Sequence, residues 1–320
     1  MKKYLSIIVP IYNARKYIEK FLESINNQTS NSFEVVFVDD RSSDDTHEFL
    51  KEWLEKNASF DYQLIMNKKN SGPGFSRNKG IELARGDYLS FSDADDYLSC
   101  EFVEKSLSLV EKCNVDLIMY DYFMVKDEVL TPQKSCLVNE YGKVSPMDAL
   151  ALSRGMCWAR VYKKSIIIEN KIKFPNIIRS EDLVFIKKYV SVCKNILYDN
   201  AYMYYYVQNR GSIMHSLKTM HVENNVRAFN EIKKIGNNEA VEMIFIREYL
   251  YLNTQIMVMK KYKFNTIRKF IGDSSKMYPQ WYKNKYIKYQ PFYLKVMFVL
   301  VRFRMLILLK LAFLLKEKRV

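Results

Sequence analysis

Short apolar runs alternate with longer segments of helical periodicity over the first 120 residues. The apolar runs predict strands at 6–9, 34–38, 63–66, 88–92 and 116–120. Amphipathic helices are expected between them, and the second helix should open with a capping box at Ser42–Asp45. Repeated strand–helix–strand units build a parallel sheet with right-handed crossovers. The sequence therefore predicts an α/β fold with a doubly wound, mostly parallel sheet.

The alternation stops after the fifth expected strand. Residues 121–145 should form an irregular insertion, for which a hairpin is one option. Beyond Thr219 the apolar spacing is helical to the end of the sequence. We therefore expect an α/β domain at residues 1–215 and a helical C-terminal region at residues 216–320.

Aspartates follow two of the expected strands. Asp39 and Asp40 come directly after the second strand, and Asp93 and Asp95 follow the fourth. In an open α/β sheet, residues just past the carboxyl ends of the strands line the ligand crevice. Carboxylates that converge there repel one another unless a cation or a donor-rich ligand compensates them. The pattern indicates a site for a metal-bound anionic substrate, and it lacks the glycine and terminal glutamate of an EF-hand loop.

The cysteines and the first residues favour a cytoplasmic location. Five cysteines are scattered without a CxxC pair, which is typical of reduced thiols and not of a disulfide framework. The first apolar stretch is too short for the core of a signal peptide, and Pro10 and Asn13 interrupt it. We expect a strand there.

The positive charge of the chain is concentrated near its C-terminus. The pI is about 9.3, and from Lys260 onward 16 Lys and Arg face two acidic residues. The preceding residues carry equal numbers of basic and acidic side chains. Because the excess is interleaved with Leu and Phe, it does not indicate nucleic-acid binding.

Four motifs in a fixed order resemble the family 2 glycosyltransferases of the GT-A fold, of the bacterial capsule and exopolysaccharide type. They are SIIVPIYN, FEVVFVDDRSSDDT, NSGPGFSRNKG and DYLSFSDADDYL. The resemblance covers roughly residues 4–215. It implies an inverting, metal-dependent enzyme that moves a sugar from a nucleotide-diphosphate donor, with a UDP-sugar expected first. The expected acceptor is a hydroxyl of a glycan or of a polyprenyl-diphosphate-linked oligosaccharide in cell-surface polysaccharide synthesis.

The resemblance also implies which residues bind the nucleotide. These are Pro10, Tyr12, Asp40, Arg77, Asn78 and Asp93. Asp40 would accept the N–H of the base, and Tyr12 would stack on the base. Ser76 departs from the family pattern, which usually has Ala before this Arg-Asn pair.

Metal and catalytic roles follow from the same resemblance. Asp95 would bind Mn²⁺ or Mg²⁺ together with Asp93, since hard cations prefer carboxylate and diphosphate oxygens. His215 is a candidate for a further metal contact. In the segment IRSEDLVF, Asp182 would be the base that deprotonates the acceptor, with Glu181 as its neighbour.

The last segment, about residues 290–320, is strongly apolar but interrupted by charges. Its longest uncharged run, Val296–Val301, is far shorter than the roughly 20 residues that span a bilayer. On one helix, most of its basic residues would form a stripe opposite Leu, Ile, Val and Phe. This pattern predicts an interfacial helix on the inner leaflet of the cell membrane. Packing on its own domain, or on a partner in a homodimer, is the alternative.

Three other functions compete with glycosyl transfer. A haloacid-dehalogenase-type phosphatase also uses a D-x-D motif, but Asp96 and the other motifs disagree with it. A nicotinamide dehydrogenase would need G-x-G-x-x-G after the first strand. A membrane-associated binding protein that kept the fold and lost turnover remains an alternative. The presence of Asp40, Asp93, Asp95 and Asp182 favours an active enzyme.

Overall fold

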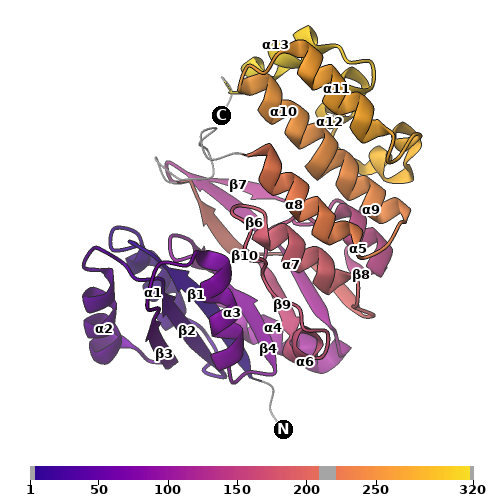
Figure 1. Ribbon diagram of the computed structural model, residues 1–320. Helices are drawn as coiled ribbons and strands as arrows, with labels where there is room; N and C mark the ends of the chain where they lie inside the picture. The colour runs from indigo at the N-terminus through magenta and orange to yellow at the C-terminus, as the bar shows by residue number, and fades with distance from the viewer. Residues whose placement is uncertain (1–3, 209–220, 318–320) are drawn as a thin grey trace. The chain divides into compact units, whose positions relative to one another are not determined.

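A computed structural model describes residues 4–208 and 221–317 of the protein. The chain forms two compact units, and Figure 1 colours it by residue number. Among the described residues, the first unit comprises 4–136, 140–149 and 154–208, and the second comprises 137–139, 150–153 and 221–317.

Within the described residues, one ten-stranded sheet organises the first unit (Figure 1). Its strands are β1 (Leu5–Ile11), β2 (Phe33–Asp39), β3 (Asp61–Met66), β4 (Tyr88–Phe91), β5 (Tyr97–Leu98), β6 (Leu117–Lys126), β7 (Val129–Gln133), β8 (Gly142–Val144), β9 (Arg160–Lys163) and β10 (Ile196–Val207). The order is β3-β2-β1-β4-β9-β6-β10-β5, with β7 on β6 and β8 on β10. Strands β3, β2, β1, β4, β6 and β10 run in the same direction. The predicted α/β fold with a mostly parallel sheet is confirmed.

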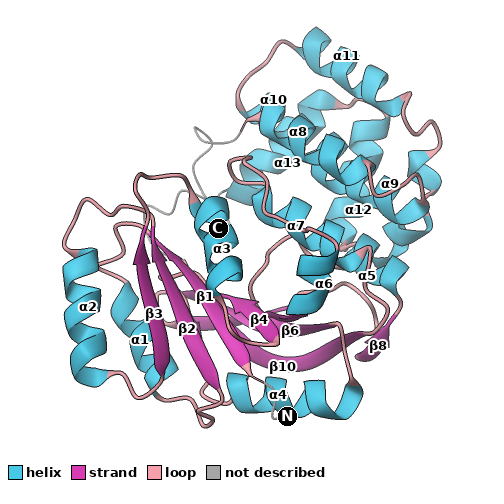
Figure 2. Ribbon diagram, turned by 60° about the horizontal axis from the view of Figure 1, so that its bottom comes forward, coloured by secondary structure: helices cyan, strands magenta, loops and turns pink. Residues whose placement is uncertain are grey.

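Helices cover both faces of this sheet (Figure 2). They are α1 (Ile18–Asn26), α2 (Thr46–Asn57), α3 (Pro73–Leu83), α4 (Phe102–Cys113), α6 (Lys164–Glu169) and α7 (Glu181–Val190), while α5 (Pro146–Leu152) begins in the first unit and ends in the second. Helices α1, α2 and α4 contribute Phe21, Leu50 and Phe102 to one continuous apolar core with the sheet. This core holds the strands whose carboxyl ends carry the aspartates.

Helices α3 and α7 pack on the other face. A Cβ on Gly80 of α3 would lie 2.4 Å from Ile8 Cγ2, so only glycine permits this close approach to β1. On α7, the ring of Phe185 meets the ring of Phe91 edge to face, with centroids 5.4 Å apart. Ile8 and Phe91 are direct neighbours in the β1–β4 pairing. The two helices therefore lie over adjacent strands of the same face.

Strand β2 is buried throughout, as expected for a central parallel strand, yet it contains a carboxylate. Glu34 accepts hydrogen bonds from Ser6 Oγ (2.7 Å), Gln63 Nε2 (2.9 Å) and the backbone N–H and Nε–H of Arg85 (2.6 and 2.7 Å). Burial alone raises the pKa of Glu34, but these donors outweigh it and hold the pKa below its ordinary value. Glu34 thus ties three strands to the chain segment that enters β4.

The second half of the sheet departs from the strand–helix alternation. Strands β6 and β7 form a hairpin, which confirms that option for residues 121–145. Its turn residues Asp127 and Glu128 have φ of 47° and 66°, as a type I′ turn requires. Strand β9 is inserted antiparallel between β4 and β6, and β10 has register shifts between Asp199 and Tyr204.

Among its described residues, the second unit is helical, as predicted. Its elements are α8 (Val222–Lys233), α9 (Glu239–Ile244), the π-helix η3 (Phe245–Tyr251), α10 (Leu252–Met259), α11 (Phe264–Ser275), the 3₁₀ segments η4 (Trp281–Lys283) and η5 (Lys285–Tyr289), α12 (Phe292–Arg302) and α13 (Leu306–Glu317). Asn238 caps α9, because its Oδ1 accepts from the backbone N–H of Ala240 (3.1 Å) and Val241 (3.0 Å).

The C-terminal segment is not the single helix that its periodicity predicts. Helix α12 ends at Arg302, Arg304 adopts a positive φ of 53°, and α13 begins at Leu306. A Cβ on Gly272 would lie 3.0 Å from a guanidinium nitrogen of Arg304, so the glycine of α11 leaves room for this side chain. Both helices pack on the ring of Tyr251 through Phe298 and Phe313. The segment therefore buries one apolar face within the second unit itself.

No helix in residues 4–208 or 221–317 combines the length and apolarity needed to cross a bilayer.

We expect the substitution Glu34→Gln to lower the free energy of unfolding at pH 7 by about 2 kcal/mol, because it removes a charged acceptor from four hydrogen bonds. The contribution of Glu34 is present above its ordinary pKa of 4.5 and is lost as the pH falls through the lowered folded-state value. The difference between the two proteins should therefore shrink in acid. Urea unfolding at pH 7 and pH 3.5 measures it, with Glu55→Gln on the exposed side of α2 as the control. Equal stability of Glu34→Gln and wild type at pH 7 would contradict the assignment.

Candidate active site

Asp40 lies just after β2 and anchors the turn that precedes α3. Its carboxylate is 3% exposed. It accepts hydrogen bonds from the side-chain amide of Asn67 (2.8 Å) and the backbone N–H groups of Ser71 (3.0 Å) and Gly72 (2.6 Å). The amide of Asn67 also donates to Ser76 Oγ on α3 at 3.0 Å. The carboxylate expected to meet a nucleotide base therefore also fixes the start of α3.

Pro10 and Tyr12 lie beside Asp40 at the end of β1. The backbone N–H of Asp40 donates to the carbonyl of Ile11 at 2.7 Å, which joins the two strand ends. Pro10 is half-buried, whereas the Tyr12 side chain is 50% exposed. Asn13 turns the chain away with a positive φ of 50°. The structure therefore brings these three predicted nucleotide-binding residues to one edge of the sheet.

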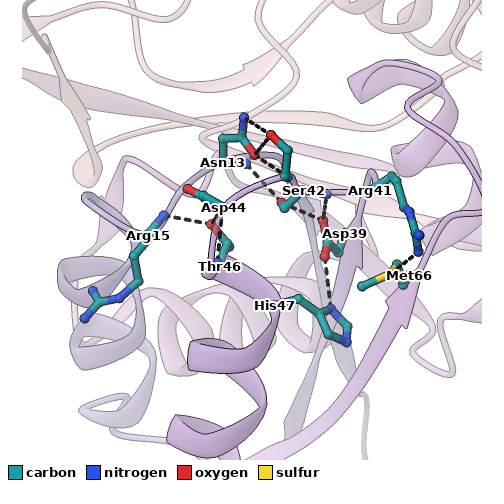
Figure 3. A network of polar contacts seen from close by, with 10 residues as sticks. Asn13, Arg15, Asp39, Arg41, Ser42, Asp44, Thr46, His47 and Met66 are labelled. Atoms are coloured by element: carbon teal, nitrogen blue, oxygen red, sulfur yellow. Dashed lines mark hydrogen bonds and ion pairs between the residues drawn. The ribbon is translucent and has the colours of Figure 1, made fainter.

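A polar network fixes the loop between β2 and α2 (Figure 3). Buried Asp39 accepts hydrogen bonds from the backbone N–H (2.9 Å) and Oγ (2.7 Å) of Ser42, and His47 Nδ1 lies 3.0 Å from its second oxygen. Helix α2 begins at Thr46, whose backbone N–H donates to Asp44 at 3.1 Å. The predicted capping box at Ser42–Asp45 is wrong, because the buried Asp39 carboxylate takes the Ser42 hydroxyl.

Arg77 brings together three carboxylates from distant parts of the chain. Its Nη2 lies 2.7 Å from Asp93 Oδ1, and its Nη1 lies 2.8 Å from Asp182 Oδ1 and 3.7 Å from Glu181 Oε1. The guanidinium is 5.5 Å from the centroid of the Phe174 ring. Burial lowers the pKa of Arg77, but the carboxylates outweigh it and hold the pKa well above its ordinary value. One cation here faces three acids, so the cluster has an excess of negative charge.

Glu181 and Asp182 occupy the first turn of α7 in a largely buried position. Burial, with a further contribution from the Asp182 charge, raises the pKa of Glu181 to about 7. Its Oε2 is buried without a hydrogen bond among the described residues. Burial also raises the pKa of Asp182, and the neighbouring Arg77 and Cys157 oppose this rise. A Cβ on Gly74 would lie 3.3 Å from Glu181 Cγ, so α3 begins in direct contact with this turn.

The turn that carries Asp93 and Asp95 is held by a buried tyrosine. The hydroxyl of Tyr204 donates to Asp96 Oδ2 (2.5 Å) and accepts from the backbone N–H of Asp93 (3.1 Å). Asp96 also accepts from the backbone N–H of Val207 at 2.8 Å. Burial raises the pKa of Asp96 well above its ordinary value. Asp96 therefore fastens the turn to β10 and supports the two aspartates before it.

The carboxylates suit a cation that is shared with a ligand. No group of three or more His, Cys, Asp or Glu encloses a metal position within residues 4–208 and 221–317. Mg²⁺ is commonly held by one or two carboxylates together with substrate phosphates. The Asp93 side chain is 31% exposed and faces an excess of negative charge, so the turn Asp93–Asp95 fits such a shared cation. His215, the other expected metal contact, lies outside the described residues.

Asn78 binds backbone instead of projecting into open space. Its Nδ2 donates to the Phe174 carbonyl at 2.9 Å, and its Oδ1 accepts from the Phe174 backbone N–H at 2.9 Å. The Phe174 ring stacks on Phe185 of α7 with centroids 4.0 Å apart and planes 3° apart. Asn78 thus attaches the segment before α7 to α3, and its expected contact with nucleotide stays a prediction.

Two residues at the site have no distinct signal in the sequence. Cys157 lies in an irregular segment and looks like an ordinary buried thiol, yet it opposes the rise in the pKa of Asp182. Tyr204 belongs to a tyrosine-rich run that is typical of a packed strand, yet its hydroxyl supports Asp93 and Asp96. The run of tyrosines along β10 was the available hint, since successive rings must face opposite sides of the sheet.

We expect the substitution Tyr204→Phe to destabilise the Asp93–Asp96 turn, because the buried Asp96 carboxylate loses one of its donors. The free energy of unfolding should fall by about 1–3 kcal/mol. Binding of Mn²⁺ together with UDP, measured by calorimetry, should weaken as Asp93 and Asp95 lose their fixed position. The control Tyr205→Phe alters the neighbouring ring of the same strand and should have little effect. Unchanged stability and unchanged binding in Tyr204→Phe would refute this role of the hydroxyl.

Comparison with solved structures shows the fold. The structure superimposes on a crystal structure of Staphylococcus aureus TarS residues 1–349 in complex with UDP-GlcNAc, with a TM-score of 0.72. The two sequences are 20% identical, and the match covers 98% of this chain and 92% of the TarS chain. A mannosyltransferase from Pyrobaculum calidifontis, in complex with GDP-Man and Mn²⁺, matches with a TM-score of 0.59 and 17% identity over 86% of this chain and 76% of that one. The expected GT-A fold is thereby confirmed.

Sequence comparison shows the family. The poly(ribitol-phosphate) beta-N-acetylglucosaminyltransferase TarS of S. aureus (strain Mu50) is 31% identical over 66% of this chain and 37% of its own length. The poly(ribitol-phosphate) beta-glucosyltransferase of Bacillus spizizenii is 28% identical over 71% of this chain and 36% of its own length. The chain thus matches little more than a third of the length of these two relatives. The model of the family described as glycosyl transferase family 2 matches residues 6–174. The chain belongs to glycosyltransferase family 2.

Proposed function

We propose that the protein is a metal-dependent inverting glycosyltransferase that uses a nucleotide-diphosphate sugar, with a UDP-sugar as the first candidate. One observation carries the proposal. Asp93 is expected to bind the donor, and Asp182 is expected to be the base. The two residues come from distant segments of the chain, yet both contact the guanidinium of Arg77. Complexes of the fold relative TarS with UDP and UDP-GlcNAc support the choice of donor.

The nucleotide would lie along the edge formed by β1, β2 and β4. Tyr12, with half of its side chain exposed, would stack on the base, while Pro10 and Asp40 border the same edge. Asp93 would face the ribose. Arg77 and Asn78 of α3 belong to the same site. Arg77 contacts Asp93 and Asp182, and Asn78 binds the backbone of Phe174.

Asp93 and Asp95 would hold the cation, Mn²⁺ or Mg²⁺, together with the diphosphate. When bound, such a cation neutralises the negative charge of the diphosphate as it leaves. The Mn²⁺ complex of the mannosyltransferase with the same fold supports this assignment. His215 would be a further contact.

Asp182 would act as the base on the acceptor hydroxyl. An inverting transfer needs a carboxylate that takes the hydroxyl proton on the side of the sugar opposite the leaving diphosphate. The Asp182 side chain is 24% exposed, so it keeps a lone pair accessible while Arg77 holds its Oδ1. Glu181 has a pKa of about 7, and its Oε2 has no hydrogen-bond partner within residues 4–208 and 221–317, so it would bind an acceptor hydroxyl beside Asp182.

The acceptor would be a hydroxyl of a glycan or of a polyprenyl-diphosphate-linked oligosaccharide in cell-surface polysaccharide synthesis. Two relatives are named for glucosyl or N-acetylglucosaminyl transfer to poly(ribitol-phosphate), which supports a cell-wall or exopolysaccharide role. Residues 1–215 would bind the donor and catalyse the reaction, and residues 216–320 would form the helical region with the membrane-associating tail.

Peripheral association with the cytoplasmic face of the cell membrane is part of this proposal. Helices α12 and α13 expose a group of apolar side chains, Phe292, Val296, Val299, Phe303, Ile307, Leu308, Leu311, Leu314 and Leu315. Residues 274–316 contain nine Lys and Arg and no acidic residue. Apolar surface with surrounding positive charge suits an anionic leaflet, whereas two copies placed face to face would repel each other.

A membrane-associated binding protein that lost turnover is the alternative. It would need the same nucleotide-binding edge but no base. The contacts of Asp182 with Arg77 and Cys157 favour the enzyme, since a carboxylate without a function would not need to be held in a partly buried, acidic cluster.

We expect Asp95→Ala and Asp182→Asn each to lower donor turnover by about 100-fold or more. Asp95→Ala should also abolish the Mn²⁺ dependence of nucleotide binding, whereas Asp182→Asn should bind the donor normally. The measurements are hydrolysis and binding of a panel of UDP-, GDP- and dTDP-sugars, with and without Mn²⁺. Near-normal turnover in Asp182→Asn would rule out the base assignment, and binding of no donor by folded wild type would favour the binding protein without turnover.

We expect the triple substitution Ile307→Ser, Leu311→Ser and Leu315→Ser to lower partitioning onto phosphatidylglycerol vesicles by about tenfold or more, because it removes exposed apolar surface. These side chains point outward, so the apolar face that α13 buries stays intact. The matched control is Val129→Ser, Leu130→Ser and Ile168→Ser, three exposed apolar residues elsewhere. Equal partitioning of the two triple variants in a vesicle sedimentation assay would exclude this surface as the membrane contact.

A further inference from the structure

Arg77 occupies a place in the site that a nucleotide contact does not explain. Its side chain is 4% exposed, and its two terminal nitrogens are engaged by Asp93 and Asp182. A group that binds a ligand directly needs donors that the ligand can reach. We propose that Arg77 is a positioning residue, which sets the orientation of Asp182 and links it to the turn that carries Asp93. This inference rests on the proposed role of Asp182 as the base.

The geometry requires a guanidinium. Nη1 meets Asp182 Oδ1 at 2.8 Å while Nη2 meets Asp93 Oδ1 at 2.7 Å, so the two carboxylates sit on the two prongs of one planar group. The spacing between the prongs is fixed by the delocalised bonds of the guanidinium. A lysine has its donors on a single nitrogen, so it could not hold the two carboxylates at the spacing that the two guanidinium nitrogens set. The position of the base therefore depends on the planar fork as well as on its charge.

The guanidinium is itself held in place. It lies near the ring of Phe174, which stacks on Phe185 of α7. Helix α7 also begins with Glu181 and Asp182. The arginine therefore contacts the first turn of α7 directly and reaches the rest of the helix through the ring of Phe174. Asn78, one residue further along α3, binds the backbone of Phe174. These contacts leave the arginine little freedom to swing toward a ligand.

Arg77 is the ion-pair partner of Asp182, with Nη1 2.8 Å from Oδ1. The buried Cys157 lies close enough to Asp182 to influence its pKa. The orientation of the Asp182 carboxylate is therefore set by the guanidinium. Arg77 acts on the reaction only through this carboxylate. Substitution of Arg77 should therefore have little effect on turnover once Asp182 has been replaced.

A double-mutant cycle tests whether Arg77 acts through Asp182. Hydrolysis of the donor that wild type turns over is measured for wild type, Arg77→Lys, Asp182→Asn and the double variant. We expect Arg77→Lys alone to lower kcat by about 30-fold or more, with the dissociation constant for the donor changed less than about threefold. In the Asp182→Asn background, Arg77→Lys should lower kcat by less than about threefold, because the effects of substituting residues that act as a unit are not additive. Additive losses in the cycle would overturn the proposal, as would a loss confined to donor binding.

The matched control is Arg85→Lys. Arg85 also pairs with a buried carboxylate, Glu34, but at the start of β4 and not at the site. Arg85→Lys should change the free energy of unfolding, and this change should be the same in wild type and in the Asp182→Asn variant. If Arg77→Lys does not fold, Arg77→Gln replaces it in the cycle, with thermal melting to confirm a folded protein.

Crystal structures of wild type and the Arg77 variant provide a readout that does not depend on turnover. We expect the Asp182 side chain to leave its wild-type rotamer or to become disordered in the variant. An unchanged, ordered Asp182 would overturn the proposal whatever the kinetics show. Absence of hydrolysis and donor binding in folded wild type would instead disprove the proposed enzyme, and the rotamer comparison would still decide the role of Arg77.

Discussion

The architecture of the site depends on one buried positive charge. Removing a guanidinium from water costs several kcal/mol unless carboxylates surround it, and carboxylates that converge in a low-dielectric place repel one another unless a cation joins them. In this site the guanidinium of Arg77 is compensated by three carboxylates, and its charge lowers the repulsion among them. The carboxylates are those of Asp93, Glu181 and Asp182. Since these residues come from α3, the end of β4 and the start of α7, their attraction holds three elements at one edge of the sheet. The three carboxylates of this cluster outnumber its one guanidinium, which suits the proposed sharing of a divalent cation with a ligand.

Much of the fold was predictable because it follows from local periodicity. Parallel strands joined by helices have a fixed direction, so Asp40 and Asp93 had to emerge at the same edge of the sheet. The pairing of Arg77 with Asp182 was not predictable in this way, because the two residues are 105 positions apart and no spacing rule joins them. Cys157 and Tyr204 were missed for a related reason. A buried thiol and a buried tyrosine look like packing until the groups that they contact are known.

The C-terminal segment shows the limit of a helical wheel. A wheel assumes one uninterrupted helix, and it placed most of the basic residues on a single stripe. The positive φ of Arg304 ends that helix and starts a second one, and the room that Gly272 leaves for the arginine belongs to another part of the chain. The apolar residues are therefore divided between a face that packs on Tyr251 and a face that is exposed. The buried face fits the alternative of packing on the same domain, and the exposed face is the one proposed to meet the membrane.

Helix α3 behaves as a rigid rod between two ends of the site. The turn before its first residue, Pro73, is clamped to Asp40, and Arg77 projects from its second turn toward Asp182. An α-helix rises about 1.5 Å per residue and bends little over such a distance. A shift of the turn at Asp40 would therefore move Arg77 and the carboxylate that it holds. Binding of a nucleotide base at one end of the helix would bear on the alignment of Asp182 at the other, although the two aspartates lie far apart in the sequence.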